Sequence, residues 1–120
     1  MLFSELVHEV QSLGLKEIRK NSYGYFEFVL RASDEGALCP ILERFFGAPF
    51  KPKNRVPTKQ ALFYSEDYGG IQKHQIMYYA ERDDWSTCAL IWPWQNGELA
   101  TVKIAQGKIK ILKSGRKKIV

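Results

Sequence analysis

The sequence predicts an α+β fold, a single layer of five mostly antiparallel strands with helices packed on one face. Asn96-Gly97 separates two strand-like runs, and this dipeptide is a strong hairpin signal because both residues tolerate positive φ. Apolar residues recur at helical spacing earlier in the chain. Short turns separate the last three strand-like runs, which cover residues 74–81, 85–93 and 98–105.

The first expected element is an amphipathic helix over residues 4–13. Ser4 is the expected N-cap and Gly14 the expected end. Its apolar stripe comprises Phe3, Leu6, Val7, Val10 and Leu13.

A hairpin is expected next, with arms at residues 15–20 and 25–31 and a turn at residues 21–24. Five of the six residues Tyr25–Leu30 are apolar, which is typical of a strand covered on both faces.

A second helix is expected over residues 38–46, with Pro40 in its first turn, where a missing amide is tolerated. Residues 47–60 form a proline-rich basic connection. Thr58 can cap a short helix through Ser65, and a strand in that place is the alternative.

The expected order is therefore α-β-β-α-(α)-β-β-β in one domain over residues 1–105. This element order resembles the profilin-like and PAS-like topologies, which implies a five-stranded antiparallel sheet carrying helices and assigns no functional residue. Residues 106–120 form a basic tail, in which residues 108–112 are an alternative sixth, edge strand.

Two-residue turns in the last three strands fix a register in which Trp92 faces Thr101, Ile91 faces Val102 and Gln75 faces Trp92. One resulting face is almost wholly apolar and is expected to receive the helices. The other mixes large apolar side chains with polar ones, and its candidate binding residues are Trp92, Trp94, Tyr79, Gln75, Met77, Thr101 and Lys103.

This mixed face predicts a non-catalytic binding or protein-interaction module. Trp92 and Trp94 would supply apolar contact, and the partner would be another protein, a second copy of the chain in a homodimer, or a small ligand. The alternative for the two indoles is burial beneath residues 47–60.

Charge is distributed in blocks, since residues 44–65 carry 5 basic and no acidic side chains and residues 106–120 carry 6 and none. Residues 1–43 and 66–105 each have a net charge of −3, so residues 1–105 together are nearly neutral at −1. The second functional hypothesis is therefore a nucleic-acid-binding accessory protein. Its expected contacts are Lys51, Lys53, Arg55, Lys59, Arg116, Lys117 and Lys118.

No sequence motif indicates catalysis, so an enzyme of unknown class is only the third hypothesis. His8, His74, Cys39 and Cys88 lack the spacing of a zinc site, and neither metal nor cofactor is expected. The two cysteines are expected to be reduced. No membrane span or signal peptide is recognisable, which favours the cytoplasm.

Overall fold

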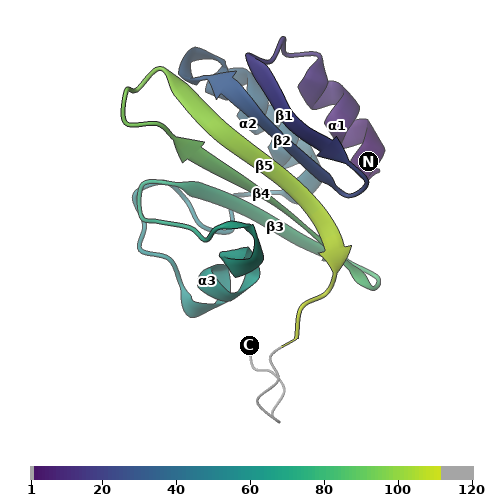
Figure 1. Ribbon diagram of the computed structural model, residues 1–120. Helices are drawn as coiled ribbons and strands as arrows, with labels where there is room; N and C mark the ends of the chain where they lie inside the picture. The colour runs from purple at the N-terminus through teal and green to yellow at the C-terminus, as the bar shows by residue number, and fades with distance from the viewer. Residues whose placement is uncertain (1, 112–120) are drawn as a thin grey trace.

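The computed structural model describes residues 2–111 and confirms the α+β fold. Five antiparallel strands form one sheet in the order β1-β2-β5-β4-β3 (Figure 1). The elements are α1 (Phe3–Gln11), β1 (Glu17–Ser22), β2 (Tyr25–Arg31), η1 (Ala32–Asp34), α2 (Glu35–Phe46), α3 (Lys59–Ser65), η2 (Glu66–Tyr68), β3 (Ile76–Arg82), β4 (Trp85–Pro93) and β5 (Leu99–Lys108).

The predicted register of the last three strands is confirmed. Ile91 pairs with Val102, and Trp92 pairs with Thr101. Pairing between β3 and β4 starts at Ile76, one residue after Gln75, which therefore has no strand partner on β4. Alternate side chains consequently occupy the two faces in the expected way.

The hairpin after β4 has a wider turn than a two-residue loop, and the register survives the difference. The Gly97 amide, at φ 73°, donates to the Trp94 carbonyl at 3.1 Å. The Asn96 side-chain oxygen accepts from the Glu98 amide at 2.9 Å. The Trp94 amide still donates to the Leu99 carbonyl at 2.9 Å, so the strands remain aligned.

The first face of the sheet, defined as the face that carries α1 and α2, holds the main core. Figure 1 shows both helices behind the sheet. Burial of apolar side chains is the main stabilising contribution to such a core. Its buried members are Leu6, Val10, Phe26, Phe28, Leu30, Leu38, Ile41, Leu42, Ile76, Tyr78, Ala89, Ile91, Ala100, Val102 and Ile104.

Both early helices begin before their expected starts. Residue Leu2 is the N-cap of α1, and its amide donates to the Glu5 carboxylate at 2.6 Å, so the prediction that Ser4 caps this helix is wrong. Helix α2 begins at Glu35, which places Pro40 beyond the first turn. Pro40 is exposed there, where water can reach the carbonyl that lacks its intrahelical amide.

The short helix after the proline-rich connection is confirmed as α3. The Thr58 hydroxyl accepts from the Ala61 amide at 3.1 Å and caps it. This helix packs on the second face, opposite α1 and α2, because Ala61 and Tyr64 contact buried residues of β3 and β4 there. The helices thus lie on both faces, and only α1 and α2 occupy the expected one.

The alternative sixth strand over residues 108–112 does not form in the described part of the chain. Lys108 ends β5, residues 109–111 are not in a strand, and residue 112 lies outside the described residues. Beyond Lys108 the chain turns toward α3, where the Lys110 ammonium lies 2.6 Å from a Glu66 carboxylate oxygen.

Candidate functional site

The second face of the sheet is divided into two halves. Figure 1 shows α3 beside β3, whereas no helix lies in front of β1, β2 or the start of β5. The α3-covered half is a small second core containing Met77, Cys88, Leu90 and Ala105. The open half is defined here by Arg19, Glu27, Val29, Trp94 and Thr101.

Stacked tyrosines close the α3-covered half. The rings of Tyr64 on α3 and Tyr79 on β3 lie 4.2 Å apart at 12°. The Tyr79 hydroxyl donates to the Glu81 carboxylate at 2.6 Å, and its pKa is raised, chiefly by burial. Met77 is fully buried beneath this layer. Met77 and Tyr79 therefore serve packing in this half.

Trp92 lies at the boundary between the two halves. The Lys103 ammonium sits 3.8 Å from the centre of the indole, within the range of a cation–π contact, and donates to the Tyr68 carbonyl at 2.8 Å. Burial lowers the pKa of Lys103, while Glu27 opposes that shift. The Trp92 indole N–H is buried and has no hydrogen-bond partner among the described residues.

Gly69 completes this boundary contact. A Cβ built on Gly69 would overlap the Trp92 ring and come within 3.3 Å of the Lys103 nitrogen. Its φ of 105° is also a conformation that L side chains rarely adopt. Glycine therefore lets the loop after η2 lie directly on the indole.

Trp94 is held on the open half by side chains. Its indole N–H donates to the Thr101 hydroxyl at 2.8 Å. The Arg19 guanidinium lies 5.6 Å from its ring centre. Arg19 is the extra residue of a β-bulge between Ile18 and Lys20, and bulges redirect side chains in this way.

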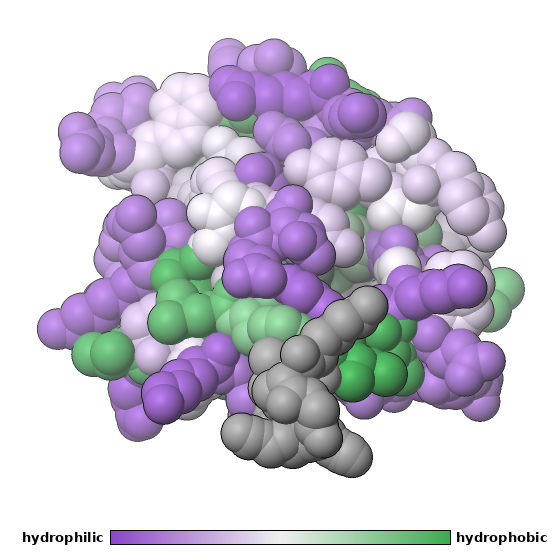
Figure 2. Space-filling model, turned by 60° about the horizontal axis from the view of Figure 1, so that its bottom comes forward, coloured by the Kyte–Doolittle hydropathy of each residue, from purple (hydrophilic) through white to green (hydrophobic). Residues whose placement is uncertain are grey.

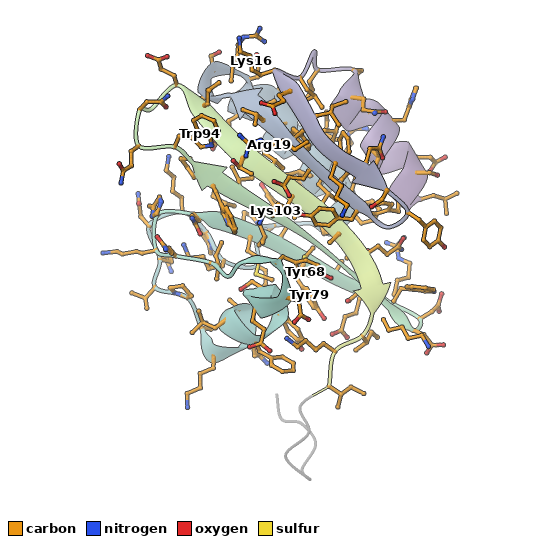
Figure 3. All side chains as sticks on the ribbon, viewed as in Figure 1. Lys16, Arg19, Tyr68, Tyr79, Trp94 and Lys103 are labelled. Carbon is orange, nitrogen blue, oxygen red and sulfur yellow. The ribbon has the colours of Figure 1, made fainter. Side chains whose placement is uncertain are left out.

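Figure 3 shows the resulting stripe along this side of the sheet, with Lys16, Arg19 and Trp94 at one end, Lys103 in the middle and Tyr68 and Tyr79 at the other. A cavity of about 440 Å³ opens at the Trp94 end of the sheet, where β1 and β2 meet the β4–β5 hairpin. Its lining residues are Lys16, Arg31, Ala32, Ser33, Gly97, Glu98 and Leu99.

The predicted binding residues are therefore separated by the structure. Four of them lie on the second face, in the open half or at its boundary: Trp92, Trp94, Thr101 and Lys103. Thr101 itself is buried, and its hydroxyl accepts from the Trp94 indole. Gln75 is buried at the start of β3, where its side-chain oxygen accepts from the Gln72 amide at 2.8 Å.

Sequence reasoning missed Arg19, Tyr68 and Gly69. A strict alternation along β1 gives no indication of the bulge that brings Arg19 to Trp94. A Gly-Gly pair such as Gly69-Gly70 is typical of a turn, but the contact of Gly69 with Trp92 depends on how α3 and η2 pack. These contacts between distant segments leave no local sequence signal.

The basic residues also divide into two kinds. Lys51 is buried, and its ammonium donates to the Gln75 carbonyl at 2.6 Å, which corrects its expected place among nucleic-acid contacts. Lys53, Arg55 and Lys59 are exposed. Arg116, Lys117 and Lys118 lie outside the described residues.

Reactive side chains do not gather in the described chain. Within residues 2–111, no group of three or more His, Cys, Asp or Glu residues has the arrangement of a metal site. Cys39 on α2 and Cys88 on β4 are both free thiols, as expected. No described helix has the length and apolar character needed to cross a membrane.

Comparison of the chain with protein-family models, with curated proteins and with solved structures found no match.

Proposed function

We propose that this protein is a non-catalytic protein-interaction module whose contact surface is the open half of the second face. The observation that carries the proposal is the pairing of Trp94 with Arg19 on a sheet surface that no helix covers. Trp, Tyr and Arg are the residues most enriched where proteins bind each other.

The composition of this surface supports a protein partner. Figure 2 shows pale residues of near-neutral hydropathy interleaved with hydrophilic ones over much of one face. Arg19 lies 3.5 Å from Glu17, and Glu27 faces Lys103, so charges of both signs lie on the same face as the Trp94 indole. An apolar anchor inside such a polar rim matches the anatomy of transient interfaces.

The geometry also lowers the cost of binding. Thr101 and Arg19 hold the Trp94 ring in position before a partner arrives. An ordered side chain loses less conformational entropy on association, by about 0.5–1.5 kcal/mol for each side chain that is already fixed.

The test compares Trp94→Ala with Leu62→Ala, a control at an exposed apolar residue on α3. Sedimentation velocity at micromolar concentration measures self-association, and quantitative affinity capture with each bait measures binding of other proteins. Trp94→Ala should weaken one of these associations by at least about tenfold, the loss typical of an interface anchor. Leu62→Ala should leave it unchanged.

Two results would contradict this proposal. One is a wild-type protein that is monomeric and captures no protein more strongly than Trp94→Ala does. The other is equal loss of binding in both variants, which would move the contact surface away from the open half.

A further inference from the structure

A second surface, called the corner below, lies where the segments 51–59 and 69–75 meet beside the start of β3. The Lys51 amide and carbonyl pair with Met77, each at 3.0 Å. The buried Lys51 ammonium also donates to the carbonyls of Lys73 and Gln75. These bonds fix Lys51, the first residue of the segment 51–59, against residues 73–77, and Figure 1 shows the segments 51–59 and 69–75 side by side.

The cations of this corner have no acidic neighbours along the chain. Lys53, Arg55, Lys59 and Lys73 are all exposed. Neither residues 44–65 nor residues 68–80 contain an aspartate or glutamate. The intervening Glu66 and Asp67 face the Lys110 ammonium at 2.6 and 3.4 Å.

Three arginines elsewhere in the described chain are partly neutralised by ion pairs. Arg19 pairs with Glu17, Arg31 with Asp34 and Arg44 with Glu9. Among the ion pairs of residues 2–111, none includes a cation of the corner. Three exposed cations on the two loops and a fourth at the first residue of α3 therefore create an uncompensated positive potential.

The corner is also stiff, so the charges keep their places. Pro52 and Pro57 fix the backbone of the first loop on either side of Arg55. Lys51 pins one end of that loop, and the Thr58 cap of α3 holds the other.

We propose that this corner, comprising Lys53, Arg55, Lys59 and Lys73, binds nucleic acid through its phosphates and without sequence preference. Repeated phosphates are the ligand that matches several exposed cations with no carboxylate among them. The corner consists of loops and the first residue of a short helix, so no element enters a groove to read bases. It is separate from the open half and does not depend on the function proposed for that surface.

The experiment uses the full chain and the double variant Lys53→Gln/Lys73→Gln. Fluorescence anisotropy measures binding of a labelled 20-nucleotide single strand and of its duplex at 50 and 200 mM salt. Each phosphate contact contributes a salt slope of about 0.7–0.9, which amounts to about tenfold in affinity at 50 mM. The double variant should therefore lose about 100-fold in affinity at 50 mM salt, and its salt slope should fall by about 1.4 for the single strand and about 1.8 for the duplex.

The matched control is Lys16→Gln/Lys20→Gln, which removes the same charge from exposed positions outside the corner. This control should retain wild-type binding and the wild-type slope. Undetectable wild-type binding to both nucleic acids at 50 mM salt would overturn the proposal. Equal losses in the two double variants would also overturn it, because net charge would then explain the binding.

Discussion

The two faces of the sheet bury side chains in different ways. On the first face, α1 and α2 cover apolar residues such as Phe28 and Leu42 continuously. On the second face, α3 and η2 cover only the side of β3 and β4. On the remaining part no helix covers the strands, yet Val29 is only 1% exposed, and Trp94 and Arg19 contact each other on the same face.

This difference explains why the second face is rich in hydroxyls and charges. The Tyr25 hydroxyl donates to Glu27 at 2.6 Å, which satisfies a polar group that partial burial would otherwise penalise. A face that is covered only by side chains must supply hydrogen-bond partners for its partly buried polar groups, whereas an apolar face that is covered by helices need not. The second face is therefore both a small core and a candidate contact surface.

Disturbing the contact between Gly69 and Trp92, at the boundary of the α3-covered half, is expected to have the larger effect on stability. Gly69→Ala should reduce the free energy of unfolding by about 1–3 kcal/mol more than Gly70→Ala, because its Cβ would overlap the indole. Gly70 is the matched control, since its φ of 86° is also positive and no atom lies within 4 Å of its Cβ position. Urea denaturation of the two variants measures the difference.

Equal losses in these two variants would mean that backbone strain alone explains the effect. The loop after η2 would then not be held by contact with Trp92, and the boundary between the two halves would need to be redrawn.

A smaller expected effect concerns the reactivity of the two cysteine thiols toward a disulfide reagent. Burial raises the pKa of the Cys88 thiol to about 12 in the α3-covered half. At pH 8, about one molecule in 10⁴ would carry the thiolate, the reactive form. Cys39 is only half-buried. A disulfide reagent at pH 8 should therefore modify Cys39 in the folded protein and spare Cys88.

The cysteine prediction is checked by mass spectrometry after timed labelling. Cys88→Ala serves as the control, because it should leave the labelling rate of the folded protein unchanged. Rapid modification of Cys88 would indicate that α3 does not exclude solvent from this half.

The sequence determined the strands and their register because both depend on local signals. The Asn96-Gly97 turn and the alternation along β4 and β5 predicted the pairs Ile91–Val102 and Trp92–Thr101. The helix capped by Thr58 was also foreseeable. The face on which α3 packs was not, because its position depends on contacts made by residues far apart in the chain.

The candidate surface was predictable only in part for the same reason. Trp94 and Lys103 follow from the register, whereas Arg19 reaches Trp94 through a bulge in an edge strand. Burial of Lys51 could not be read from a basic, proline-rich segment. Only its contact with the β3 segment shows that this lysine is an internal anchor.

A boundary at Trp92 divides the second face into the α3-covered half and the open half. The most direct test compares the free energy of unfolding of Trp92→Ala and Trp94→Ala by urea denaturation followed by circular dichroism. Trp92→Ala should lower the free energy of unfolding by about 3 kcal/mol, because the ring fills the space between Gly69 and Lys103. Trp94→Ala should lower the free energy of unfolding by about 1 kcal/mol, because this variant loses one hydrogen bond and one exposed cation–π contact. Equal losses, or unfolding of both variants, would contradict the division of this face.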